Sequence, residues 1–377
     1  MQPPVDIASL PAPAQRILDA NAPAPLRQMA ARGIAPGLKP ADAITVVAIL
    51  AESLETAIAD IASATLRKLP TPILNGALSS DLPAGVIDVI APLYATDVGV
   101  MERMLALPSI LMETVATIAA RANEAVSELI ATNEQRLLLN PAIIEKLYMN
   151  RATRMSTADR LIELAVRNKL ELTGIPAFKE AVMAMANELV TVTEPGSEPT
   201  FSDILFKETE ALAQVITLDV SAEDTHAMDD TGEEVVVEKF VPLYAKIADM
   251  STSEKIRLAM LGTATERSLL VRDTNKLVAS AAIRSPAIQE NEVVRISASR
   301  AVSDDVLRII ALNREWTRSH QIKVNLVANP RTPFAFSSKL ILHLREHELK
   351  MLSKSKNVTG AVVSAAKQQL EKRTKKG

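Results

Sequence analysis

The clearest chemical spacing in the sequence lies near its C-terminal end, at His343-Leu344-Arg345-Glu346-His347. If this segment is helical, His343 and His347 stand four residues apart on one face. Two imidazoles in that arrangement can share a zinc ion. The segment therefore raises the hypothesis of a metal-dependent hydrolase.

The same five residues fit the His-x-x-Glu-His signature of inverted zincin peptidases. Such a site needs a third protein ligand, usually a glutamate farther along the chain. Only thirty residues follow His347, and Glu371 lies among them in a basic tail. We therefore expect a polar helix face here and no bound metal, with His343 and His347 kept as weak metal candidates.

Other catalytic motifs are missing or better explained as turns. The sequence has neither a glycine-rich phosphate-binding loop nor a Gly-x-Ser-x-Gly elbow. The Ser-x-x-Lys pattern at 353–356 has a sister at 297–300, which favours a shared turn over a nucleophile. The acidic pairs at 229–230 and 304–305 lack the flanking ligands of a calcium loop. We expect no catalytic residue and no cofactor, and hence a protein that is not an enzyme.

Basic residues around one tryptophan and at the C-terminal end are candidates for binding a partner. Trp316 lies between Arg314 and Arg318, where it could anchor a partner or fill a seam between helices, and we favour the seam. From residue 331 to the end there are eleven Lys/Arg against three Glu, a net charge of +8. The partner-binding candidates are Arg314, Trp316, Arg318, Lys350, Lys354, Lys356, Lys372 and Arg373.

The composition predicts an all-α protein. Apolar residues make up 48% of the 377 residues but aromatic residues only 3%, so the apolar content is mainly Ala, Leu, Ile and Val. Alanine and leucine favour helices because they lose little side-chain freedom there. The absence of cysteine fits a reducing compartment. The apolar stretch from Ile44 to Ile61 carries three carboxylates and is expected to be one buried amphipathic helix, not a membrane span.

The chain divides by composition into five parts. Residues 1–40 hold eight of the 21 prolines and predict a flexible arm, and residues 41–193 predict a first helical repeat domain. Residues 194–239 carry thirteen Asp/Glu against two Lys, a net charge of −11, and predict an acidic linker or insertion with one helix at 203–216. Residues 240–370 predict a second repeat domain, and residues 371–377 a basic tail.

Internal echoes indicate short helical repeats. Helix starts marked by Pro72, Pro108 and Pro141 lie 36 and 33 residues apart. Residues 296–306 align without gaps with residues 352–362, which places Ser303 and Thr359 at helix N-caps. A short helix pair cannot bury its apolar face alone, so stacking against the next pair would give an α-solenoid with a long exposed surface.

The last third of the chain resembles a known class of repeat. The segment at 324–333 is similar to HEAT-like and leucine-rich-repeat-variant units, and the segments at 275–281, 313–316 and 329–333 carry a wider resemblance. Residues 255–370 as a whole resemble an uncharacterised bacterial family of such repeats. The resemblance implies the fold and assigns no functional residue.

These observations favour a non-enzymatic, cytoplasmic scaffold or adaptor that binds protein partners along its helical surface. One alternative is the binding of nucleic acid or another anionic surface through the basic C-terminal repeats. The distant alternative is the hydrolase that would use His343 and His347. The sequence leaves open the identity of the partner and the oligomeric state.

Overall fold

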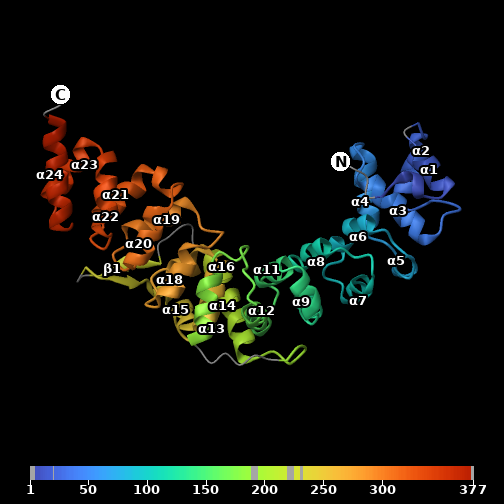
Figure 1. Ribbon diagram of the computed structural model, residues 1–377, viewed down its shortest axis with the longest axis horizontal. Coiled ribbons are helices and arrows are strands. Elements are labelled where there is room, and N and C mark those ends of the chain that lie inside the picture. The colour runs from blue at the N-terminus through green and yellow to red at the C-terminus, as the bar shows by residue number, and fades with distance from the viewer. Residues whose placement is uncertain (1–4, 20, 188–193, 219–224, 230–231, 375–377) are drawn as a thin grey trace. The chain divides into compact units, whose positions relative to one another are not determined.

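The computed structural model describes residues 5–19, 21–187, 194–218, 225–229 and 232–374 (Figure 1). This part of the chain forms 24 α-helices, with short 3-10 turns and one two-stranded sheet, so the expected all-α class is confirmed. The chain divides into two compact units. The first comprises Met1–Leu161 with Glu194–Gly196, and the second comprises Ile162–Thr193 with Ser197–Gly377.

The first unit begins with helices where the sequence analysis expected an extended arm. They are η1 (Ile7–Ser9), α1 (Ala12–Leu18) and α2 (Ala24–Ala31). Pro11 and Pro23 are the N-cap residues of α1 and α2, and each helix has a further proline in its first turn, where the missing N–H is not needed. The prolines therefore start helices rather than prevent them. Ala14 and Ala30 are fully buried, because α1 and α2 pack against the next helix along the chain.

The apolar stretch from Ile44 to Ile61 forms two helices, so the expectation of a single helix is wrong. The helices are α3 (Pro40–Ala51) and α4 (Thr56–Leu66), and they pack against each other. Between them the Ser53 hydroxyl accepts a hydrogen bond from the Glu55 backbone N–H. Leu54 in this turn is 98% exposed. The three-to-four-residue spacing of apolar residues continues through the turn, and the spacing alone could not reveal the break.

The rest of the first unit is a run of short helices. They are α5 (Thr71–Leu78), α6 (Ala84–Ile90), η2 (Ala91–Leu93), α7 (Val98–Ala106), α8 (Met112–Ala119), α9 (Glu124–Ala131), α10 (Glu134–Leu139) and α11 (Ala142–Tyr148). α12 (Met155–Arg167) contains the division between the units. Helices α3, α5, α7 and α9 each contact the next of this set, and α8 contacts α11. Pro72 lies in the first turn of α5 and Pro141 is the N-cap residue of α11, as the sequence predicts. Pro108 does not start a helix, because it lies in the turn between α7 and α8.

The second unit continues with the same kind of short helix. Its elements are α13 (Phe178–Asn187), α14 (Phe201–Leu218), β1 (His226–Met228), β2 (Glu234–Val236), η3 (Glu238–Phe240), α15 (Val241–Ala248), α16 (Thr252–Leu261), α17 (Ala264–Leu270), α18 (Lys276–Ile283), α19 (Glu290–Ala298), α20 (Asp304–Leu312), η4 (Trp316–Arg318), α21 (His320–Ala328), α22 (Phe334–Leu340), η5 (Ile341–His343), α23 (Glu346–Lys354) and α24 (Gly360–Thr374) (Figure 1). From α16 onward, alternate helices touch: α16 contacts α18, α18 contacts α20, and α19 contacts α21. Ser303 caps α20 through its side chain, as expected.

The acidic segment holds more structure than a linker would. The helix expected at residues 203–216 is present as α14, which packs against α15, α16 and α17. The antiparallel hairpin of β1 and β2 lies within the stretch expected to be irregular. Residues 219–224 and 230–231 of that stretch lie outside the described residues.

Candidate functional site

Two alternate helices of the second unit, α19 and α21, are joined by an asparagine side chain. Asn329, just after α21, is 4% exposed. Its amide nitrogen donates to the carbonyl oxygens of Ser297 and Ser299, at 3.0 and 2.7 Å, and its amide oxygen accepts from the Arg331 N–H at 3.0 Å. Those two carbonyls lie at the end of α19, where a helix leaves acceptors without intrahelical partners. The Asn329 side chain, at the end of α21, thus supplies hydrogen-bond donors to the carbonyl groups at the end of α19.

The same arrangement occurs in the first unit. Asn150, just after α11, donates from its amide nitrogen to the carbonyl oxygens of Ala119 and Ala122, both at 2.8 Å. Its amide oxygen accepts from the Ala152 N–H at 2.9 Å. We call this arrangement, seen at Asn150 and Asn329, the amide clasp. Its only signal in the sequence is an asparagine after a helix, and the sequence analysis gave neither residue a role.

A buried ion pair and a histidine–glutamate contact join other helices of the second unit. Arg267 on α17 donates to both carboxylate oxygens of Glu292 on α19, at 3.0 and 2.9 Å, with both side chains almost fully buried. His320 on α21 lies 2.7 Å from a carboxylate oxygen of Glu348 on α23. Burial alone would raise the pKa of Glu348, but hydrogen bonds from the Arg345 N–H and His320 outweigh it, so this pKa lies below its ordinary value. Both glutamates also cap the start of their own helix.

The two histidines considered for zinc do not share a helix. His343 ends η5, Leu344 and Arg345 are extended, and His347 lies in α23. The helical spacing that would bring the two imidazoles to one face is therefore missing. Across the described residues, no group of three or more His, Asp or Glu side chains is placed to hold a metal ion.

Trp316 lies in the turn between α20 and α21. Its side chain is half-buried, while Arg314 and Arg318 are exposed. Arg318 forms an exposed ion pair with Glu315 at 2.7 Å. Leu312, at the end of α20, is 65% exposed. A partner that contacted this turn would meet leucine, tryptophan and arginine side chains together.

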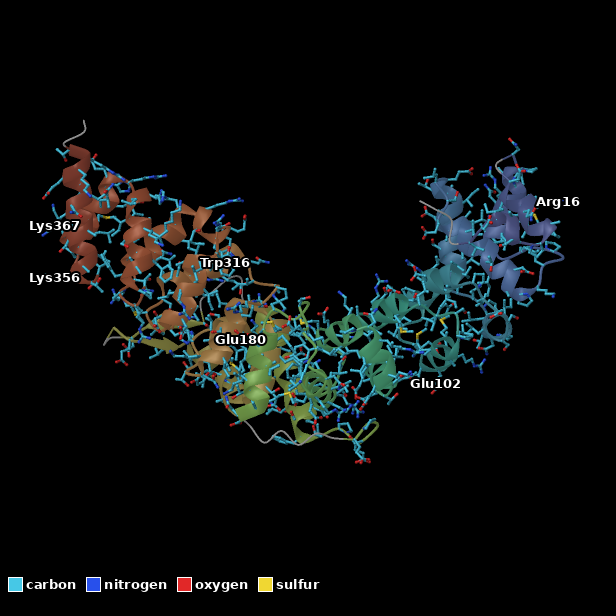
Figure 2. All side chains as sticks on the ribbon, in the orientation of Figure 1. Arg16, Glu102, Glu180, Trp316, Lys356 and Lys367 are labelled. Atoms are coloured by element: carbon cyan, nitrogen blue, oxygen red, sulfur yellow. The ribbon has the colours of Figure 1, made fainter. Side chains whose placement is uncertain are left out.

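The basic residues of the C-terminal end fall into two groups. Arg373 donates to the carbonyl oxygens of Leu344 and Leu342, at 2.8 and 3.0 Å, so it holds α24 against the turn before α23. Lys350 pairs with Glu346 at 2.6 Å. By contrast, Lys354, Lys356, Lys367 and Lys372 are exposed and have no acidic partner among the described residues. Figure 2 labels Lys356, in the turn before α24, and Lys367, on α24.

The described residues of the second unit line a larger and a smaller cavity. The larger, about 630 Å³, is formed by α13 and the loop before it and is lined mainly by apolar side chains such as Ile175, Phe178 and Met183. Its rim carries Glu180, labelled in Figure 2, which pairs with Arg284 at 3.3 Å. The smaller, about 320 Å³, lies between the β1–β2 hairpin and helices α15 to α17. We call it the hairpin cleft.

A single carboxylate from the acidic segment anchors the hairpin. Glu234 accepts hydrogen bonds from the Ser299 hydroxyl and the Arg300 N–H, both at 2.6 Å, and pairs with Arg272 at 3.4 Å. Burial works to raise the pKa of Glu234, but these hydrogen bonds and the charge of Arg272 prevail and lower it. Glu234 was counted in the sequence only as one of many acidic residues. Its structural role depends on partners as far away as Arg300.

In comparisons with known proteins, no family model, no curated protein and no solved structure matches the chain. None of the described helices has the length and apolar character needed to cross a membrane. Function is therefore inferred from the geometry of the described residues alone.

Proposed function

We propose that this chain is a non-enzymatic α-solenoid of HEAT-like or leucine-rich-repeat-variant-like helix pairs, which binds protein partners along its exposed helical surface. The amide clasp is the observation that carries the proposal. It occurs in both units with the same donors and acceptors and joins helix ends about thirty residues apart. Contacts between alternate helices, which occur in both units, also support the stacking of one helix pair on the next. Stacked pairs present long surfaces for macromolecular partners.

The turn around Trp316 is the partner surface that we favour. Arginine, tryptophan and other aromatic residues are enriched where proteins bind each other. Arg314, Trp316 and Arg318 lie within five residues, next to the exposed Leu312. Because the tryptophan is already half-buried, its side chain loses little entropy when a partner binds, and the exposed arginines beside it add charged contacts.

A reconstituted complex tests this proposal. A protein that co-purifies with the chain at physiological salt is itself purified and titrated against the chain. We expect a dissociation constant in the micromolar range or below, typical of specific complexes. The double variant Arg314→Ala/Arg318→Ala should weaken binding about tenfold or more. The double variant Arg16→Ala/Arg103→Ala, on helices of the first unit, is the control and should bind as the wild type does. If both double variants bind the partner as tightly as the wild type does, the assignment of this surface is contradicted.

A second candidate function is the binding of anionic polymers, and the four unpaired lysines favour it. Lys354, Lys356, Lys367 and Lys372 form no ion pair with an acidic side chain among the described residues. Release of counterions from a polyanion makes such binding steeply dependent on salt. We expect the Lys354→Glu/Lys356→Glu/Lys372→Glu variant to lose binding to single-stranded nucleic acid, and the slope of affinity against salt to fall. Binding that does not change with salt would refute this candidate.

The cytoplasm is the compartment we propose for both activities. A chain without cysteine has no disulfide to maintain and suits a reducing environment.

A further inference from the structure

The hairpin cleft combines apolar walls with charged groups. The hairpin contributes His226, Glu234 and Val236, and α15 contributes Tyr244 and Ile247. The other lining side chains include Lys255 of α16, Leu269 of α17, and Arg272, Asp273 and Thr274 of the turn that follows. Its volume of about 320 Å³ equals roughly ten water molecules at ~30 Å³ each. The space fits a small metabolite rather than a polymer.

Two charged pairs line the cleft, and they differ in how fully they are bonded. The Glu234 carboxylate accepts bonds on both oxygens from Ser299, Arg300 and Arg272. Arg272 also donates to the carbonyl and hydroxyl oxygens of Ser268. This pair is fixed in the wall and holds the hairpin in place.

The second pair is loosely bonded. Lys255 Nζ lies 3.7 Å from Asp273 Oδ2, which is too far for a hydrogen bond, and 3.4 Å from the carbonyl oxygen of Ala248. Asp273 Oδ1 accepts from the Asn275 N–H at 2.7 Å, so the other oxygen remains available. Both side chains are only 17% exposed. The Lys255 ammonium, whose hydrogen bond to Ala248 is long, and Asp273 Oδ2 therefore both line this small space and keep capacity to bond a ligand's polar groups.

We propose that the hairpin cleft binds a free α-amino acid. Lys255 would bind the ligand's carboxylate, and Asp273 would bind its ammonium group. An α-amino acid carries both groups on one carbon, so it matches two opposite charges that lie 3.7 Å apart. The cleft has two cations and two carboxylates, and a ligand without net charge preserves that balance. Val236, Tyr244, Ile247 and Leu269 also line the cleft and would contact an apolar side chain of the ligand.

Titration of the full-length chain with the twenty common L-amino acids, by calorimetry or thermal shift, tests the proposal. We expect at least one with an apolar side chain to bind with a dissociation constant of about 1 mM or tighter. The same compound without its ammonium group, or without its carboxylate, should bind at least about tenfold more weakly. No binding by any of the twenty up to about 10 mM, or equal binding of both analogues, would overturn the proposal.

Variants decide whether binding occurs in this cleft. Asp273→Asn and Lys255→Met should each weaken binding about tenfold or more. Lys246→Met is the matched control, because Lys246 lies on α15 and pairs with Glu208 of α14 at 2.5 Å without lining the cleft. If Lys255→Met does not fold by circular dichroism, Asp273→Asn, which keeps the size of the side chain, decides alone. Unchanged binding in Asp273→Asn would overturn the proposal, whatever the outcome of the partner-binding experiments.

Discussion

At the scale of single residues, the amide of Asn329 donates two hydrogen bonds that no apolar side chain could form. It is buried and supplies both donors that the end of α19 needs. Removing it leaves two carbonyl oxygens without a partner and without access to water, and each such group costs about 1–3 kcal/mol. The same reasoning applies to Asn150 in the first unit.

We therefore expect Asn329→Ala to lower the free energy of unfolding by about 2–4 kcal/mol. Asn357→Ala is the matched control, because Asn357 is exposed and its side chain has no hydrogen-bond partner among the described residues. The control should change stability by less than about 0.5 kcal/mol. Urea denaturation measures both. Equal stabilities for the two variants would show that the clasp contributes nothing.

A buried ion pair should respond differently from an exposed one. Arg267→Met leaves the Glu292 carboxylate buried without its cation, and breaking such a pair typically costs about 3–5 kcal/mol. Arg308→Met removes an exposed partner of Asp305, and pairs of that kind contribute less than about 1 kcal/mol. The difference between the two variants, measured by thermal or chemical denaturation, checks the burial of Arg267. Similar small losses in both would contradict it.

The hairpin anchor predicts a dependence on pH. The pKa of Glu234 is lower in the folded chain than its ordinary value of 4.5. The stability that this carboxylate contributes is therefore fully present above about pH 4.5 and is lost as the pH falls through the lowered pKa. We expect Glu234→Gln to be less stable than the wild type at pH 6, and the difference to shrink below pH 4.5. A difference that stays constant with pH would contradict the ionised state of Glu234.

At the scale of elements, the sequence predicted the class of secondary structure and many helix starts, because proline and capping residues act locally. Pro72, Pro141 and Ser303 lie where helix starts were expected, whereas Pro108 lies in the turn before α8. The match of residues 296–306 with residues 352–362 corresponds to one structural position, the end of one helix followed by the start of the next.

Features that depend on partners distant in the sequence were not predictable. Apolar spacing did not reveal the break between α3 and α4, and proline content wrongly suggested an unfolded segment over α1 and α2. The amide clasp, the Arg267–Glu292 pair and the Glu234 anchor each join residues at least 25 positions apart. Local propensity carries no information about such pairs. The helical premise for the histidine pair failed for the same reason, because the short η5 ends at His343.

The packing of α2 can be tested directly. Ala30 is fully buried, so Ala30→Leu forces extra volume into a filled space and should cost about 1–3 kcal/mol. Ala24→Leu, at an exposed position of the same helix, should have little effect. Limited proteolysis of both variants gives the readout, with faster cleavage near residue 30 only in Ala30→Leu. Identical cleavage patterns would favour the extended arm that the prolines first suggested.

At the scale of the whole molecule, the chain has two compact units but only one tryptophan, Trp316, which belongs to the second. Tryptophan fluorescence therefore reports the unfolding of the second unit, while far-ultraviolet circular dichroism reports the helices of both. We expect Asn150→Ala to shift the circular dichroism transition and to leave the fluorescence transition in place. A matching shift in both signals would mean that the two units unfold together.

The hairpin anchor also has a consequence for the order of events during synthesis. Most ties between helices join residues about 25 to 32 positions apart, so each new helix pair can dock soon after it leaves the ribosome. Glu234 is different, because its partners Ser299 and Arg300 lie 65 and 66 residues later. Its full set of hydrogen bonds can therefore form only after residues 299 and 300 have been synthesised. In a nascent chain that stalls before residue 299, the β1–β2 hairpin would lack its hydrogen bonds to Ser299 and Arg300, and this side of the hairpin cleft would not be fixed.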